Sequence, residues 1–198
     1  MKKIKLAVLA SHGGTNFQAI AEACVSGMLP ATVELLVCNN KNAYCLERAR
    51  SLGIPSLILP THQFSKLTDW DRSLAENLAK LEIDYVLLAG FMKKIGPKML
   101  EMYKDKIINI HPSLLPKYGG KNMYGINVHR AVLENKELET GLTIHLVNEK
   151  YDEGKILAQK VVKIENVNTA EDLSEMLRPL ENQFYVETLR EYLASRNS

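Results

Sequence analysis

The sequence IKLAVLASHGGTNFQAI, from Ile4 to Ile20, contains the signals of a strand, a turn and a helix in direct succession. Its first seven residues are almost all apolar, which is typical of a strand that is buried on both faces of a parallel sheet. Two glycines follow, and a helix is predicted from Asn16 to Ser26. This order is typical of open α/β sheets, which bind ligands at the carboxyl ends of their strands.

The same alternation of strand and helix continues along the first half of the chain. Further helices are predicted over residues 44–52 and 69–81. Between the helices stand short apolar segments with strand character: VELLVCN from Val33, SLILP from Ser56, YVLLAG from Tyr85 and KIINI from Lys106. The pattern predicts a mostly parallel, twisted sheet with helices on both of its faces.

After His111 the pattern changes. A helix over 127–134 precedes two longer segments, GLTIHLVN and KILAQKVVKI, which we expect to form antiparallel strands. A last helix is predicted from Thr169, its N-cap, to the C-terminus, and Pro179 is expected to disturb or divide it. With no internal repeat or linker, we predict one α/β domain over residues 1–198.

Composition narrows the classes of function. The chain has 198 residues with 25 basic and 23 acidic side chains, a balance that argues against a nucleic-acid partner. No apolar run approaches the roughly 20 residues that would span a bilayer, and Lys5 interrupts the apolar start, which makes a poor signal peptide. Three cysteines show neither CxxC nor metal-ligand spacing. We therefore expect a soluble cytoplasmic protein without a metal.

The glycine turn after the first strand is a candidate phosphate site. Backbone N–H groups at a helix N-terminus attract anions, and Gly13 and Gly14 would allow close approach of the backbone. Thr15 and Asn16 would add side-chain donors. An ordinary polar turn would also explain these residues. No GxGxxG occurs, and CNNKN stands where a dinucleotide-binding protein has an acidic residue, so a nicotinamide cofactor is not expected.

The segment NIHPSLLPKYGG begins where a buried strand should end. Alternation places Asn109 and His111 on the same side of that strand. An amide can donate a hydrogen bond to a developing oxyanion, and an imidazole can move a proton near neutral pH. Asp152, in the loop NEKYDEGKILAQ, is the candidate partner that would orient His111 or raise its pKa. A solvated acid and a structural histidine remain the alternative.

Several ordered segments together resemble the folate-dependent formyltransferases, over nearly the whole chain: GGTNFQAI, LERARSLGI, VLLAGFMKKI, NIHPSLLPKY, VHRAVLENKELETGLTIHLVNEKYDEGKILAQ and LENQFYVETL. Within that family they are similar to members that act on glycinamide ribonucleotide in purine biosynthesis. The resemblance implies the formyltransferase fold and a one-carbon group transferase. Its reaction would move a formyl group from the co-substrate 10-formyltetrahydrofolate to the substrate amine, with no metal.

The resemblance also implies roles for particular residues. Asn109 and His111 would stabilise the tetrahedral intermediate, with Asp152 assisting. The nucleotide substrate would be bound by Gly14, Thr15, Asn16, Arg178 and Glu181, of which Glu181 lies near the ribose. The folate would be bound by Lys66, Met92, Lys93, Lys94, Ile95 and Asn109. Both partners are small molecules, with no nucleic acid and no membrane, and the oligomeric state is left open.

Two regions of the sequence depart from the family pattern. His12 and Thr15 stand where the family more often has glycine and serine, and the loop around Lys121 is longer than usual.

A 10-formyltetrahydrofolate hydrolase normally has an extra N-terminal domain, and a methionyl-tRNA formyltransferase an extra C-terminal one. A non-catalytic phosphate-binding module would need no Asn109, His111 and Asp152 together.

Overall fold

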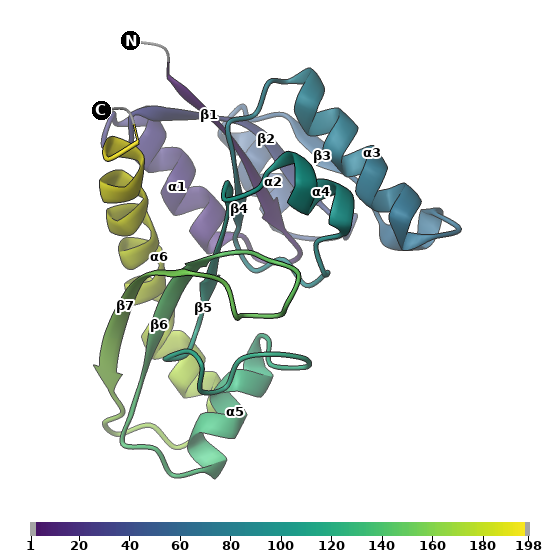
Figure 1. Ribbon diagram of the computed structural model, residues 1–198. Coiled ribbons are helices and arrows are strands. Elements are labelled where there is room, and N and C mark those ends of the chain that lie inside the picture. Colours follow the sequence, from purple (N-terminus) through teal and green to yellow (C-terminus); the bar gives the residue numbers. More distant parts are fainter. Residues whose placement is uncertain (1–2, 197–198) are drawn as a thin grey trace.

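The computed structural model of the protein describes residues 3–196, in which strands and helices alternate along most of the chain (Figure 1). The elements are β1 (Ile4–Ala10), α1 (Thr15–Val25), β2 (Ala31–Cys38), α2 (Cys45–Ser51), β3 (Ser56–Ile58), a short 3₁₀ helix (Thr61–Gln63), α3 (Leu67–Lys80), β4 (Tyr85–Leu88), α4 (Pro97–Met102), β5 (Ile107–His111), α5 (Ile126–Glu134), β6 (Glu139–Leu146), β7 (Ile156–Lys163) and α6 (Ala170–Ala194).

All seven strands form one sheet in the order β3-β2-β1-β4-β5-β6-β7. The first five strands are parallel, whereas β6 and β7 are each antiparallel to the preceding strand. This confirms the predicted mixed sheet with an antiparallel C-terminal portion. The strand order reverses between β1 and β4, so a crevice is expected at the carboxyl ends of these two strands.

Helices cover both faces of the sheet, as predicted (Figure 1). Alternate residues of β1 point to opposite faces because the side-chain period of a strand is two. Leu6 and Val8 join the core under α1, α2 and α6, while Ala7 and Leu9 join the core under α3 and α4. Trp70 of α3 is buried in the second core, and its indole N–H donates to the Leu59 carbonyl at 3.0 Å.

The C-terminal helix corrects one prediction. Pro179 lies inside α6, yet the helix is continuous from Ala170 to Ala194. Leu173 and Leu177 are buried before the proline and Tyr185 and Leu189 after it, so packing along the whole helix offsets the lost N–H. The predicted cap is confirmed, because the Thr169 hydroxyl accepts from the Asp172 N–H at 3.1 Å. The helix was predicted to reach the C-terminus but ends at Ala194, with Ser195 as its C-cap; residues 197–198 lie outside the described residues.

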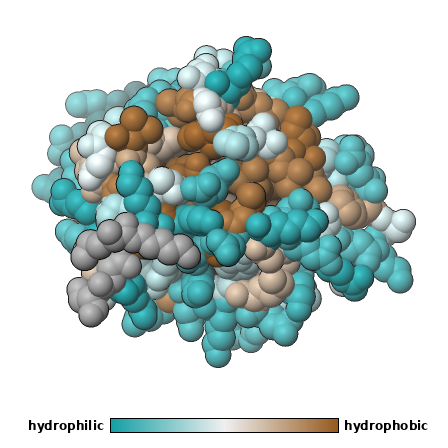
Figure 2. Space-filling model, turned by 90° about the horizontal axis from the view of Figure 1, so that it is seen from above, coloured by the Kyte–Doolittle hydropathy of each residue, from teal (hydrophilic) through white to brown (hydrophobic). Residues whose placement is uncertain are grey.

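The surface combines charged and apolar regions. Seen from above, apolar residues gather over a broad part of the surface and hydrophilic residues surround them (Figure 2). Exposed large apolar side chains include Val25 and Met28 at the end of α1 and Leu138 before β6. No helix within residues 3–196 has the length and apolar character needed to cross a membrane.

Helix α4 was not predicted, and a buried carboxylate holds its first turn. Asp71 of α3 is 1% exposed, and its oxygens accept from the N–H groups of Gly96, Lys98 and Met99 at 3.1, 2.6 and 3.4 Å. These donors are the N–H groups that a helix start leaves without an intrahelical partner. Asp71 therefore fixes α4 and the end of the segment that follows β4.

We expect Asp71→Ala to lower the free energy of unfolding by about 2–3 kcal/mol, because it leaves buried N–H groups without an acceptor. Urea denaturation measures the change. Asp69→Ala is the matched control on the same helix, where the exposed carboxylate should contribute less than about 1 kcal/mol. Equal losses in the two variants would contradict this role of Asp71.

Candidate active site

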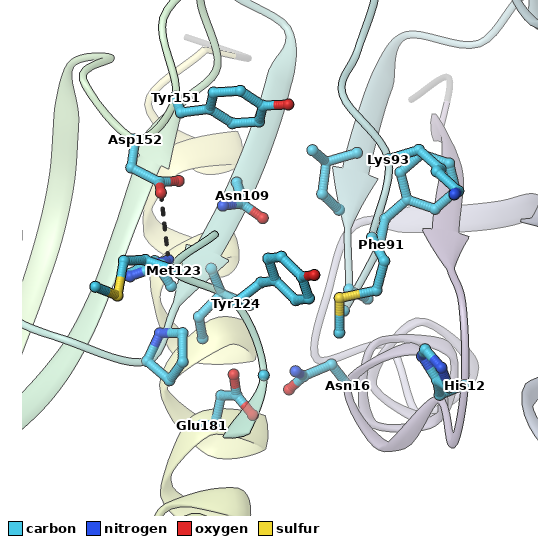
Figure 3. A pocket seen from close by; sticks show the side chains of 18 of the residues that line it. His12, Asn16, Phe91, Lys93, Asn109, Met123, Tyr124, Tyr151, Asp152 and Glu181 are labelled. Atoms are coloured by element: carbon cyan, nitrogen blue, oxygen red, sulfur yellow. Dashed lines mark ion pairs between the residues drawn. The ribbon is translucent and has the colours of Figure 1, made fainter. Parts of the chain in front are cut away.

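A cavity of about 740 Å³ opens at the carboxyl ends of β1, β4 and β5, where the strand order reverses. Asp152 and Asn109 lie on one wall of the cavity and Phe91 and Lys93 face them from the other (Figure 3). Of the predicted site residues, the cavity is lined by Gly14, Thr15, Asn16, Met92, Lys93, Lys94, Ile95, Asn109, His111, Asp152, Arg178 and Glu181. Segments from both halves of the chain thus meet in one space.

Lys66 is the predicted residue that does not line the cavity. It is exposed and forms the N-cap of α3, which begins at Leu67. The predicted folate-binding segment, from Met92 to Ile95, follows β4 directly. The Met92 N–H donates to the Ser11 hydroxyl at 2.8 Å, and that hydroxyl donates to the Asn39 side-chain oxygen at 2.6 Å. These bonds tie the segment to the turn after β1.

Asp152 and His111 are neighbours although 40 residues separate them in the sequence. The Nδ1 atom of His111 lies 3.7 Å from an oxygen of Asp152, and the imidazole is 4% exposed. The same carboxylate oxygen accepts from the Gly120 N–H at 2.9 Å. Asp152 has a φ of 56°, in the left-handed region that a non-glycine residue rarely adopts. The turn holds this strained conformation and aims the carboxylate at the histidine.

The two groups shift one another's proton affinity. Burial lowers the pKa of His111 below its usual value, while the Asp152 charge and the Tyr118 carbonyl act in the opposite direction without overcoming it. Burial would raise the pKa of Asp152, but the neighbouring His145 and His111 and the Gly120 N–H together bring it below its usual value. The site therefore holds an ionised carboxylate beside an imidazole that is neutral at pH 7.

The tautomer of His111 follows from its second hydrogen bond. Its Nε2 lies 2.8 Å from the Tyr118 carbonyl oxygen. A carbonyl can only accept, so Nε2 must carry the proton, as inferred from the hydrogen-bond network. Nδ1 is then the nitrogen that gains and loses a proton, and it is the one beside Asp152.

His145 is a site residue that the sequence did not single out. It lies opposite Asn109 in the antiparallel pairing of β5 and β6, and its Nε2 is 3.1 Å from the Asn109 side-chain nitrogen. Its Nδ1 donates to the Leu146 carbonyl at 2.9 Å, so Nε2 accepts and turns the Asn109 nitrogen toward β6. A Cβ on Gly154 would lie 1.7 Å from the same carbonyl oxygen, so only glycine leaves it room.

The glycine turn has the geometry of an anion site. Gly14 is the N-cap of α1, and no side chain caps the helix there. The first N–H groups of α1 thus remain free for a ligand. The two glycines differ, because a Cβ on Gly14 would lie 2.5 Å from Cβ of Cys45, whereas Gly13 has open space. Position 14 requires glycine because Cys45 packs directly beneath the turn. Gly13 leaves the other side of the turn open to a ligand.

Arg48 also lines this end of the cavity and was not predicted. Its Nε donates to the Gly13 carbonyl at 2.8 Å, and its guanidinium lies 4.9 Å from the centre of the Tyr44 ring. It also donates to the Gln18 side chain. These contacts hold the guanidinium beside the turn, where its positive charge favours an anion. The LERARSLGI segment contains Arg48, but nothing in it indicated contact with the turn.

At the same end of the cavity, Glu181 of α6 faces Asn16 of α1 (Figure 3). Burial raises the pKa of Glu181 to about 7, although hydrogen bonding with Asn16 and the charge of Arg178 act in the opposite direction. The Asn16 side-chain oxygen is buried and has no hydrogen-bond partner among the described residues. The Asn16 oxygen is therefore an acceptor available to a ligand, and Arg178 is exposed one helical turn from Glu181.

An α/β sheet with a histidine–carboxylate pair and a candidate anion-binding turn in one crevice favours a group-transfer protein over a dinucleotide-binding one. The family model described as "Formyl transferase" matches residues 4–189. The chain belongs to the formyl transferase family.

Two similar proteins are both named phosphoribosylglycinamide formyltransferase. The chain is 43% identical over 189 residues to the chloroplastic phosphoribosylglycinamide formyltransferase of Arabidopsis thaliana, with 95% of this chain and 65% of that protein covered. It is 39% identical over 181 residues to the phosphoribosylglycinamide formyltransferase of Haemophilus influenzae, with coverage of 91% and 83%. The chain thus spans less than two thirds of the length of the plant relative.

Solved structures agree in fold. Glycinamide ribonucleotide transformylase 1 from Symbiobacterium toebii has a TM-score of 0.92 at 36% identity, and the alignment covers 98% of this chain and 89% of that one. The transformylase 1 from Geobacillus kaustophilus has a TM-score of 0.90 at 38% identity, with 97% and 100% covered. The formyltransferase fold predicted from the sequence is confirmed.

The raised pKa of Glu181 predicts a pH-dependent stability. Its pKa is about 7 in the folded protein against a usual 4.5, so between these values the folded state binds more protons than the unfolded state. Stability should fall as pH rises through this window, by at most about 3 kcal/mol from this group. Denaturation of Glu181→Gln at pH 4.5 and 7.5 should show a smaller difference than wild type.

Glu191→Gln, an exposed position on the same helix, is the control for that series and should follow the wild type. If Glu181→Gln loses as much stability over the interval as wild type does, the burial of this carboxylate would not govern its titration.

Proposed function

We propose that the protein transfers a formyl group from 10-formyltetrahydrofolate to the primary amine of glycinamide ribonucleotide. The observation that carries this proposal is the meeting of Asn109, His111 and Asp152 in a cavity that also contains the anion-binding turn. Membership of the formyl transferase family and the names of the relatives support it. The 740 Å³ volume lies within the range of about 300–1,000 Å³ that is usual for ligand pockets.

The ribonucleotide would bind at the end of the cavity beneath α1. The free N–H groups of Gly14, Thr15 and Asn16 would hold its phosphate, and the charges of Arg48 and Arg178 would favour the dianion. The ribose hydroxyls would donate to the Glu181 carboxylate and to the unpartnered oxygen of Asn16. This placement leaves the glycinamide amine directed toward β5.

The formyl donor would lie between the segment after β4 and the loop that carries Asp152. Met92, Lys93, Lys94 and Ile95 line this part of the cavity. Lys94 lies 5.0 Å from the centre of the Tyr151 ring, so the two walls already touch across the mouth. Lys66 would take no part in folate binding, because it lies outside the cavity lining.

Attack of the neutral amine on the formyl carbon forms a C–N bond and places negative charge on the formyl oxygen. Asn109 uses one N–H on His145, and its remaining N–H can donate to that oxyanion. A fixed donor is effective here because it needs no reorganisation as charge develops. His145 and Gly154 would therefore act on the reaction only through the orientation of Asn109.

Nδ1 of His111 would accept the proton that the attacking nitrogen loses. The attacking nitrogen becomes acidic once bonded to carbon, and Nδ1 of His111 can accept its proton because Nε2 is held by Tyr118. Asp152 stabilises the resulting imidazolium, which then donates to N10 of the folate as the C–N10 bond breaks. The products are the formylated amine and tetrahydrofolate.

A coupled assay tests the proposal. The protein is mixed with glycinamide ribonucleotide and 10-formyltetrahydrofolate, and deformylated folate is followed together with formylated product. We expect equal amounts of both products and none when the amine is omitted. Folate released without the amine would instead indicate a formyl-folate hydrolase, and phosphate binding without turnover would indicate a non-catalytic module.

Asp152→Asn should reduce kcat by roughly 100-fold or more, because an amide cannot stabilise the His111 imidazolium. KM for the ribonucleotide should change little, since the phosphate turn is unaltered. The neighbouring Glu153→Gln, an exposed carboxylate that pairs with Lys150, is the control and should keep wild-type kcat. Circular dichroism and thermal melting confirm that both variants are folded. Comparable rates for Asp152→Asn and Glu153→Gln would eliminate this mechanism.

A further inference from the structure

Two cysteines lie together beneath the phosphate turn. Cys38 is the last residue of β2 and Cys45 the first of α2, and the segment 39–44 joins them. Their sulfur atoms are 3.6 Å apart, both side chains are fully buried, and neither forms a disulfide. The proposed reaction does not use them.

The two thiols are not equivalent. The Cys45 S–H donates to the Cys38 sulfur, and the Asn40 N–H lies 3.4 Å from the same sulfur. These donors favour the thiolate, and the pKa of Cys38 falls to about 7, first through Cys45 and despite the opposing effect of burial. The pKa of Cys45 is raised, first by its hydrogen bond to Cys38 and then by burial. Cys38 is therefore the more acidic of two thiols in contact, and its own S–H can donate to the Asn40 carbonyl at 3.2 Å.

Cys45 is also part of the support of the turn. Its N–H donates to the His12 carbonyl at 2.9 Å. Its Cβ occupies the space directly behind Gly14, where an added methyl group would lie only 2.5 Å away. Cys38 is followed by Asn39, whose side chain accepts from the Ser11 hydroxyl. Each cysteine thus connects within one residue to the turn that precedes α1.

We propose that Cys38 and Cys45 form a reversible disulfide under peroxide, and that this bond loosens the turn from Ser11 to Asn16. The Cys38 thiolate attacks one oxygen of hydrogen peroxide, giving a sulfenic acid and hydroxide. The Cys45 thiol then displaces the sulfenic hydroxyl, so that an S–S bond forms and water leaves. The two sulfurs together lose two electrons, which the peroxide accepts.

Bond formation requires the two sulfur atoms to approach each other. A disulfide is about 2.05 Å long, so the sulfurs have to approach by roughly 1.5 Å from their present separation. We expect Cys45 to move in this approach, which would withdraw its Cβ from the space behind Gly14. Because both sulfur atoms are buried, the proposal requires the joining segment, in which Lys41 and Asn42 are exposed, to open and admit an oxidant of the size of water.

The experiment uses the whole chain treated with hydrogen peroxide and then with dithiothreitol. Peptide mass spectrometry should show a loss of 2 Da on a peptide that links Cys38 to Cys45, restored by dithiothreitol. Hydrogen exchange of the amides in 11–20 should be at least three-fold faster in the oxidised protein, whereas exchange in α6 should not change. Neither readout depends on formyl transfer, so this inference and the proposed function can fail separately.

Two variants serve as matched controls. Cys45→Ala should abolish both the linked peptide and the change in exchange. Cys24→Ala, which removes the third buried cysteine in the last turn of α1, should leave both intact. Burial raises the pKa of Cys24 to about 11, so it should compete poorly for peroxide. Stable over-oxidation of Cys38, a bond that involves Cys24, or unchanged exchange after disulfide formation would each overturn the inference.

Discussion

The carboxylate of Asp152 is the constraint on which the arrangement of the site depends. It lies between two histidines, 3.7 Å from Nδ1 of His111 and 3.6 Å from Nε2 of His145, and it accepts the Gly120 N–H. A largely buried charge is stable only where such partners surround it. The loop that carries Asp152 therefore contacts the ends of β5 and β6. The loop before α5 contacts the same carboxylate through Gly120. The arrangement of the site and the proposed chemistry thus both involve this one side chain.

The pairing of strands determines what that side chain can do. The register of β5 and β6 sets Asn109 opposite His145, and Gly154 leaves space for the Leu146 carbonyl that fixes the His145 tautomer. A register shift of one residue would reverse the faces of all these side chains. The reversal of strand order between β1 and β4 then places the phosphate turn on the same cavity. The residues proposed for binding and for proton transfer thus lie at one sheet edge.

Much of this fold was predictable because its signals are local. Apolar runs of strand length and the Thr169 cap indicate their elements directly, and alternation along one strand placed Asn109 beside His111. The pairing of Asp152 with His111 depends on a turn with positive φ, and it was predicted mainly through the family resemblance. Pro179 was misjudged because packing on both sides of it outweighs one lost hydrogen bond. Arg48 and His145 were missed because their roles come from contacts between elements that are distant in the sequence. Lys66 was assigned to the folate site from the family resemblance alone, and the local sequence pattern gave no independent support for that position.

The central claim is that the charge of Asp152 controls the proton on Nδ1 of His111. Its most direct test is a ¹⁵N NMR titration of the His111 imidazole in the wild type and in Asp152→Asn. The account predicts that Nε2 stays protonated throughout, that Nδ1 titrates, and that the pKa of His111 falls further in the variant because an attractive charge is lost. An unchanged or higher pKa in Asp152→Asn, or titration at Nε2, would contradict it.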